Sequence, residues 1–292
     1  MNEPCPQRPV LRWHGGKWML APWIIAHLPE HNVYVEPYGG AGSVLMRKPR
    51  SYAEIYNDLD DDVVGLFRVL QNQDQAARLR ELLALTPFAR TEFKRAYQET
   101  SDPVERARRL VIRCFMGFGS DGHNADVKTG FRANSNRSGT TPAHDWRNFP
   151  DSLEDIIDRL RGVTVECRPA LKVMADHDRV GAVHYVDPPY LPASRSKKSR
   201  RGKIRYHAYR HEMTEEQHAE LLEFLKTLQG AVVLSGYPSE LYDDALRGWH
   251  REERAALADG ARPRVEVLWM NEACCDRRGA GPLFAPAREA AE

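Results

Sequence analysis

Short apolar runs typical of β-strands alternate with helical segments near both ends of the chain. The run at Val33–Glu36 leads through a Gly-rich turn into a helix start, and a Thr214–Gln217 capping box opens a later helix. The predicted strands lie at 33–36, 52–57, 163–166, 182–186, 231–235 and 265–270, with helices at 43–48, 60–70, 214–228 and 239–246. Such alternation predicts the α/β class with a largely parallel sheet.

The alternation is interrupted between residues 75 and 159. Residues 75–115 are helical and rich in Arg, whereas 117–150 contain many Gly, Asn, Ser and Thr residues with little apolar periodicity. A long irregular stretch inside a compact domain is usually either functional or disordered. We therefore expect a domain formed by 10–74 and 160–272, a mainly helical insertion at 75–159, and flexible tails at 1–9 and 279–292.

The composition narrows the class of protein. The 292 residues are 42% hydrophobic and 28% charged, which excludes collagen, coiled coils and global disorder. No apolar run approaches the roughly 18 residues that a membrane span needs, and the N-terminus lacks the apolar core of a signal peptide. We expect a cytoplasmic protein without a membrane partner. The five cysteines lack metal-ligand spacing, so we expect reduced thiols and no metal.

A Gly-rich turn at 37–42 connects the first strand to the next helix. Backbone amides at such a helix start form a site for a nucleotide-like ligand. Because Leu45 replaces the third glycine of the dinucleotide fingerprint and no P-loop lysine follows, an adenosine cofactor without phosphates fits better. The alternative is a tight structural turn. Asp58, at the end of the second strand, is placed to accept hydrogen bonds from ribose hydroxyls.

The tetrapeptide Asp187-Pro188-Pro189-Tyr190 directly follows an apolar strand. The Asp carboxylate and the Pro188 carbonyl can accept both N–H bonds of an exocyclic amine, which frees the nitrogen lone pair for attack. Successive prolines fix the backbone that directs this carbonyl. Tyr190 can stack on a base taken out of the double helix. Positioning and electrostatics then suffice for catalysis, while the alternative is a Pro-rich turn that only ends the strand.

Four motifs occur in a characteristic order: RWHGGK at 12–17, VEPYGGAGSV at 35–44, ND at 57–58 and DPPY at 187–190. With them the chain resembles the Dam-type (D12 class, α group) DNA adenine N6-methyltransferases over most of residues 10–271. The resemblance implies a Rossmann-like, S-adenosylmethionine-dependent methyltransferase sheet with a target-recognition insertion. It also implies site-specific methylation of N6 of a flipped-out adenine in double-stranded DNA, as in bacterial, phage or restriction-modification enzymes.

The resemblance also implies roles for individual residues. Asp187 would touch both the cofactor amino group and the target N6, with Pro188, Pro189 and Tyr190 completing the catalytic motif. Residues 163–170 would border the cofactor adenine, and the N-terminal segment must fold back over the first strand. The implied cofactor contacts are Trp13, Lys17, Glu36, Pro37, Tyr38, Gly40, Gly42, Ser43, Asp58 and Asp187.

Two segments are candidates for DNA contact. The run 194–206, SRSKKSRRGKIRY, holds seven basic residues and no acidic one, and it begins four residues after Tyr190. We expect phosphate contacts there, a solvated charged face being the alternative. Side chains of the insertion can read base edges, but 128–132 only partly match the family's recognition hairpin, so a GATC target does not follow. The predicted DNA-binding residues are Arg12, Asn124, Lys128, Arg132, Asn134, Arg137, Arg195, Lys197, Lys198, Arg200, Arg201 and Lys203.

The net charge of +1 hides a segregation along the chain. Because the basic run carries seven positive charges, the rest of the chain has a net charge of −6. Part of this negative charge, at Glu54, Asp58 and residues 60–62, is expected beside the cofactor pocket. Whole-chain neutrality is therefore no evidence against a nucleic-acid partner.

Two alternative functions remain open. The same fold could methylate another planar amine, such as cytosine N4, an RNA base or a glutamine amide, but Asp187 and the large insertion favour adenine in DNA. A catalytically silent DNA-binding module is the second alternative, and the presence of Lys17, Asp58 and Asp187 argues against it. We expect a monomer.

Overall fold

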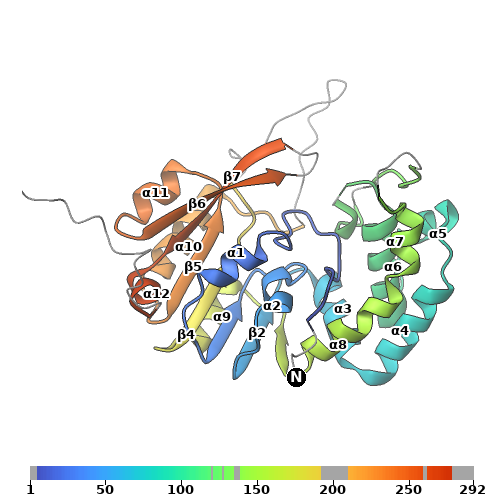
Figure 1. Ribbon diagram of the computed structural model, residues 1–292, viewed down its shortest axis with the longest axis horizontal. Helices are drawn as coiled ribbons and strands as arrows, with labels where there is room; N and C mark the ends of the chain where they lie inside the picture. Colours follow the sequence, from blue (N-terminus) through green and yellow to red (C-terminus); the bar gives the residue numbers. More distant parts are fainter. Residues whose placement is uncertain are drawn as a thin grey trace, which may run out of the picture.

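The computed structural model describes residues 5–119, 121–126, 128–134, 139–191, 210–258 and 262–277. Within these residues, seven strands form one sheet in the order β3-β2-β1-β4-β5-β7-β6 (Figure 1). Strands β1 to β5 are parallel, and β7 runs antiparallel to both β5 and β6. The strands are β1 (Val33–Glu36), β2 (Ala53–Asn57), β3 (Val163–Glu166), β4 (Ala182–Val186), β5 (Ala231–Gly236), β6 (His250–Ala258) and β7 (Arg262–Met270).

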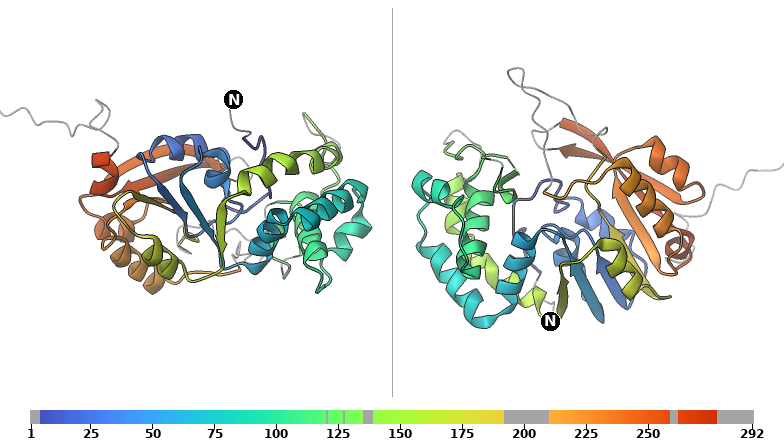
Figure 2. Two further views of the ribbon diagram at one scale, coloured as in Figure 1. Left: turned by 90° about the horizontal axis from the view of Figure 1, so that it is seen from below. Right: turned by 180° about the vertical axis from the view of Figure 1, so that it is seen from behind.

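Helices cover both faces of the sheet, so the fold is the predicted layered α/β architecture (Figures 1 and 2). On one face, α9 (Ala170–His177), α10 (Glu215–Leu225) and α11 (Glu240–Ala245) pack against the sheet in one apolar cluster. The other face is covered by α1 (Ala21–Ala26), α2 (Ser43–Arg47), α3 (Asp61–Gln71) and α12 (Glu272–Arg277). The capping box predicted at Thr214 and Gln217 is present at the start of α10.

The interrupting segment is mainly helical and lies to one side of the sheet, beside α3 (Figure 1). Its α-helices are α4 (Gln73–Leu85), α5 (Arg90–Arg95), α6 (Pro103–Met116), α7 (Pro142–Arg147) and α8 (Leu153–Leu160), with 3-10 turns at Asp121–His123 and Pro150–Ser152. Their buried side chains share one apolar cluster with the sheet. The boundaries of a separate recognition domain therefore remain a prediction. No described helix has the length and apolarity to cross a membrane.

Several elements were not predicted from the sequence. Strand β6 lies at the edge of the described sheet and pairs with β7, and its sequence HREERAALA has many charged residues, as edge strands tolerate. The helices α1 and α12 have six residues each, which is too short for a periodic apolar pattern.

The N-terminal segment folds back over the end of β1, as predicted. Val10 and Leu11 are buried in the core, and the Arg8 guanidinium lies 5.3 Å and 5.2 Å from the Phe115 and Phe149 ring centroids. Arg8 also donates a hydrogen bond to the Asp145 carbonyl at 3.2 Å. Arg8 therefore packs on the insertion, and the flexible tails expected at 1–9 and 279–292 stay predictions, with residues 1–4 and 279–292 outside the described residues.

Candidate active site

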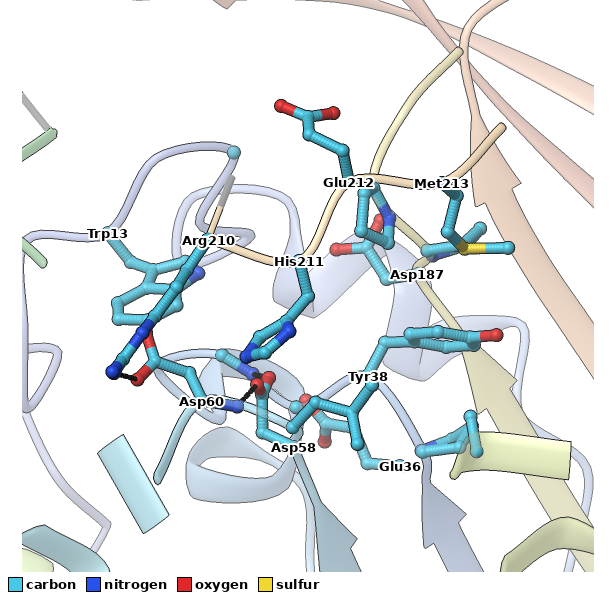
Figure 3. A pocket seen from close by; sticks show the side chains of 18 of the residues that line it. Trp13, Glu36, Tyr38, Asp58, Asp60, Asp187, Arg210, His211, Glu212 and Met213 are labelled. Atoms are coloured by element: carbon cyan, nitrogen blue, oxygen red, sulfur yellow. Dashed lines mark hydrogen bonds and ion pairs between the residues drawn. The ribbon is translucent and has the colours of Figure 1, made fainter. Parts of the chain in front are cut away.

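A cavity of about 540 Å³ opens at the carboxyl ends of β1, β2 and β4 (Figure 3). Its volume is that of a small-molecule site, and this edge of an open parallel sheet is where ligands bind. Among the described residues, no cluster of three His, Cys, Asp or Glu could hold a metal ion. The predicted site residues that line the cavity are Trp13, Lys17, Glu36, Pro37, Tyr38, Gly40, Ser43, Asp58, Asp187, Pro188 and Pro189.

The Gly-rich turn forms one wall of the cavity. Gly40 has a φ of +49°, and a Cβ on it would lie 2.5 Å from the Trp13 indole nitrogen. The indole therefore packs directly on this backbone. Gly42 also has a positive φ, but a Cβ there would meet Phe67 of α3 at 3.3 Å. Gly42 is not among the residues that line the cavity, so its cofactor contact stays a prediction.

Asp58 braces this turn. One carboxylate oxygen accepts the Gly40 backbone N–H at 2.7 Å and the other accepts the Asp60 N–H at 2.8 Å. Burial raises the pKa of Asp58 to about 6, although these two hydrogen bonds oppose the rise. His211 lies beside Asp58 in Figure 3, and its charge favours the ionised carboxylate. Asp58 is therefore a polar acceptor whose charge can change near neutral pH.

Glu36 is buried beneath the turn. Its carboxylate accepts the Tyr34 hydroxyl at 2.7 Å and the Leu45 backbone N–H at 2.9 Å. Burial raises the pKa of Glu36 to about 8 despite these two hydrogen bonds. Glu36 thus ties β1 to the first turn of α2 and supports the cavity wall from below.

Asp187 is held from two other segments of the chain. Its Oδ1 accepts the Ser235 hydroxyl of β5 at 2.8 Å, and the Lys17 ammonium lies 3.0 Å from Oδ2. Lys17 is buried and also donates to the Gly15 carbonyl at 2.9 Å. Both oxygens of Asp187 therefore have a fixed orientation at the cavity. Ser235 was not predicted, although its place at the end of the strand next to β4 is a usable sequence signal.

Tyr190 is buried beside the cavity and is not among the residues that line it. Its hydroxyl donates to Glu266 Oε2 at 2.9 Å, and the Lys17 Nζ lies 4.7 Å from its ring centroid. The Tyr237 ring meets it edge-on, with the centroids 4.3 Å apart. Stacking of Tyr190 on a base thus stays a prediction.

Two parts of the cavity wall were not predicted. Residues 210–213 cross above Asp58 and Asp187, as Figure 3 shows. Arg210 Nη1 bonds carboxylate oxygens of Asp60 and Asp61 at 2.9 Å, at the start of α3, so this segment is tied to a helix N-terminus.

The insertion contributes His123, whose ring centroid lies 4.4 Å from that of Trp13. Residues 169–172 also line the cavity and overlap the region expected to border the cofactor.

The predicted DNA-binding residues are placed unevenly. Lys128 and Asn134 are exposed, and Arg132 is half-buried. Asn124 is buried, and its side-chain oxygen accepts the Asp126 N–H at 3.0 Å. This hydrogen bond closes a local turn, and the base-reading role of Asn124 stays a prediction. Half-buried Arg12 lies close enough to Cys114 of α6 to influence that thiol's pKa.

The remaining predicted residues lie outside the described residues: Arg137, Arg195, Lys197, Lys198, Arg200, Arg201 and Lys203.

The expectation that Glu54 lies beside the cofactor pocket is wrong. Glu54 lies at the opposite end of β2 from the cavity. Its carboxylate is buried and bonds Lys48 at 2.7 Å and Arg159 at 2.7 and 2.8 Å. Burial alone would raise the pKa of Glu54, but the Arg159 and Lys48 partners lower it overall. Of the acidic residues expected beside the pocket, Asp58 and Asp60 line the cavity.

Comparison with known proteins identifies relatives that match most of the chain. Residues 13–257 match the model of the D12 class N6 adenine-specific DNA methyltransferases. The chain is 26% identical to the DNA adenine methylase of Escherichia coli (strain K12) over 279 residues, which cover 89% of this chain and 94% of that protein. It is 26% identical to the DNA adenine methylase of Salmonella typhi over 84% of each chain. A type II methyltransferase of Lactococcus lactis subsp. cremoris is 27% identical over 87% of this chain and 90% of that protein.

Proposed function

Since the chain belongs to the D12 class of N6 adenine-specific DNA methyltransferases, we propose that it transfers the methyl group of S-adenosylmethionine to N6 of an adenine flipped out of double-stranded DNA. The observation that carries this proposal is the placement of Asp187. Its carboxylate lies at a small-molecule cavity and is held there by Ser235 and Lys17. A hydrogen-bond acceptor fixed in this way suits catalysis in which the enzyme orients the substrate amine and forms no covalent bond with it.

The residues around the cavity fit S-adenosylmethionine. Asp58 can accept hydrogen bonds from ribose hydroxyls while it braces Gly40, and the Asp187 carboxylate complements the positive charges of the donor. Glu36 also lines the cavity and offers the donor a hydrogen-bonding group. The aromatic rings of Trp13 and Tyr38 supply apolar surface for the rest of the molecule. When bound, S-adenosylmethionine supplies an electrophilic methyl group on a sulfonium sulfur.

The protein's own contribution is to orient and activate the amine. The N6 lone pair of adenine is delocalised into the ring, so N6 is a weak nucleophile in water. Asp187 and the Pro188 carbonyl accept its two N–H bonds, which draws the nitrogen toward tetrahedral geometry and localises the lone pair. Ser235 and Lys17 keep the carboxylate in place, so little reorganisation is needed during reaction. Tyr190 stacks on the flipped base.

Recognition of the DNA is assigned to two groups of residues. Lys128, Arg132, Asn134 and Arg137 of the insertion read base edges, while Arg12 and the basic residues between 195 and 203 contact phosphates. Support comes from the exposure of Lys128 and Asn134 and from the charge of the basic run.

Methyl transfer from labelled S-adenosylmethionine to mixed-sequence DNA, followed by sequencing of modified bases, tests this function. We expect N6-methyladenine in one sequence context. Asp187→Ala should lower the rate by roughly 100- to 1,000-fold, as removal of a preorganised polar group from an active site does. Asp244→Ala is the matched control, because Asp244 is exposed on α11 and pairs locally with Arg247.

Two outcomes would contradict the proposal. Equal methylation by Asp187→Ala and the wild type would refute the mechanism. Tight DNA binding without any methylated base would instead favour a DNA-binding module.

A further inference from the structure

A buried carboxylate reaches the catalytic motif from the antiparallel strand. Because β7 runs opposite to β4 and β5, its first half lies at the same edge of the sheet as the carboxyl ends of the parallel strands. The β5–β7 ladder ends at the pair Gly236 and Val267. Glu266 directly precedes Val267 in β7. It therefore lies just past the part of β7 that pairs with β5, beside the DPPY segment.

Glu266 holds Tyr190 by its hydroxyl. The Tyr190 Oη donates to Glu266 Oε2 at 2.9 Å, with Tyr190 only 5% and Glu266 only 7% exposed. A buried hydrogen bond to a carboxylate is stronger and more directional than a neutral one at the surface. The far end of the tyrosine side chain is therefore anchored on β7, while its Cα is anchored on the segment after β4.

Further contacts restrict the ring itself. The Tyr237 ring packs edge-on against Tyr190, and the Arg264 guanidinium lies 4.8 Å from the Tyr237 ring centroid while donating to its hydroxyl. Glu266 is not among the residues that line the cavity. Its direct hydrogen bond to the catalytic motif is the one to Tyr190, while its charge also acts on Lys17 and Asp187, a contribution that a neutral variant removes.

We propose that Glu266 is a positioning residue for methyl transfer, which sets the orientation in which the Tyr190 ring stacks on the target base. This inference rests on the proposed function, in which Tyr190 contacts that base. A small misplacement of a reacting group can lower a rate by about 100-fold. Removal of the Glu266 acceptor should therefore slow the chemical step more than it weakens DNA binding.

Two substitutions separate the hydrogen bond from the charge. Glu266→Ala removes both, whereas Glu266→Gln keeps an acceptor oxygen of similar reach and removes the charge. Tyr190→Phe deletes the same hydrogen bond from the other side. If the bond is what matters, Glu266→Ala and Tyr190→Phe should reduce activity to a similar extent, and the double variant should be little worse than either one alone.

The experiment uses a duplex that contains the target sequence found by modified-base sequencing. The methyl-transfer rate is measured in single turnovers, and 2-aminopurine in place of the target adenine reports stacking. We expect Glu266→Ala to lower the rate roughly 10- to 100-fold, with a much smaller change in the Kd for DNA. The flipped 2-aminopurine should be brighter than in the wild-type complex because an aromatic ring no longer quenches it. Glu266→Gln should restore both readouts.

Glu253→Ala is the matched control, since Glu253 is an exposed carboxylate on the neighbouring strand β6 and pairs with Arg251. It should behave as wild type. Thermal melts check that each variant is folded, and Tyr190→Phe still tests the hydrogen bond if Glu266→Ala does not fold.

The inference is overturned if Glu266→Ala matches the wild type in rate and fluorescence, if Glu266→Gln is as slow as Glu266→Ala, or if the effects of Tyr190→Phe and Glu266→Ala add in full. A wild-type protein that never methylates DNA would refute the proposed function instead.

Discussion

At the scale of single residues, the carboxylates around the cavity differ in what surrounds them. Asp187 faces a hydroxyl and an ammonium, Asp58 faces two backbone amides, and Glu36 faces a buried hydroxyl and one amide. Burial raises the pKa of Glu36 to about 8 and that of Asp58 to about 6. Glu36 and Asp58 therefore change charge in different pH ranges.

Glu36→Gln should show this difference as a change in stability with pH. The pKa of Glu36 is about 8 in the folded protein, whereas the ordinary pKa of a glutamate is 4.5. Between these values the folded state binds one more proton than the unfolded state, so the Glu36 contribution to the free energy of unfolding falls as pH rises. The slope is at most about 1.4 kcal/mol per pH unit. Gln keeps the acceptor oxygen and does not titrate.

Urea unfolding of the ligand-free protein at pH 5, 6.5 and 8 measures this effect. The stability of Glu36→Gln relative to wild type should increase across the series. A difference that is constant with pH would show that Glu36 is ionised in the fold throughout.

At the scale of elements, the turn between β1 and α2 makes close backbone contacts with side chains from other parts of the chain. Gly40 packs under the Trp13 indole, and Asp58 from the end of β2 holds its amide. Three segments that are separate in sequence therefore meet on a residue with no side chain. A methyl group there would disturb all three at once.

Gly40→Ala should destabilise the protein and weaken cofactor binding together. The left-handed φ of +49° costs a residue with a Cβ about 1–3 kcal/mol, and the Cβ would also lie 2.5 Å from Trp13 Nε1. Calorimetric titration with S-adenosylmethionine and urea unfolding measure the two effects.

Gly65→Ala is the matched control, because Gly65 lies within α3 and a Cβ there meets nothing within 4 Å. It should stabilise the protein by up to about 1 kcal/mol, the difference in helix propensity between the two residues. Equal behaviour of the two variants would show that the contact with Trp13 has no energetic consequence.

At the scale of the whole molecule, the insertion and the catalytic sheet are joined at the cavity. Arg106 of α6 pairs with Asp61 and Asp62 at the start of α3, and Arg210 pairs with Asp60 and Asp61 from the other side. His123 of the insertion lies against Trp13. The segment that is proposed to read the DNA therefore shares contacts with the wall of the small-molecule site.

The charge segregation predicts two kinds of DNA-binding variant. Changing Lys197, Lys198, Arg200 and Arg201 to Ala should weaken binding to all sequences. The slope of log K against log salt concentration should become shallower by about 0.9 for each DNA phosphate that the variant no longer neutralises. Lys128→Ala or Arg132→Ala should instead alter the preferred bases.

Titrations at several salt concentrations and sequencing of the methylated sites measure these effects. Lys226→Ala is the control, since Lys226 pairs with Glu223 at the end of α10. A change of target sequence in the 197–201 variant would contradict the division of roles.

The amino-acid sequence alone specifies the layered α/β fold, the order of the motifs and the edge at which they meet. This is possible because parallel strands end at one edge, so residues that follow β1, β2 and β4 must converge there. The same rule is enough to bring Gly40, Asp58 and Asp187 together.

The three-dimensional packing, in contrast, decides which remote side chains surround these residues. Ser235, Glu266, Arg210 and His123 reach the site through strand order, the register of β7 and the packing of the insertion. Packing also decides that Glu54 pairs with Arg159 of α8 at the far end of β2. Such choices depend on contacts between segments far apart in the chain, and no local pattern of residues encodes them.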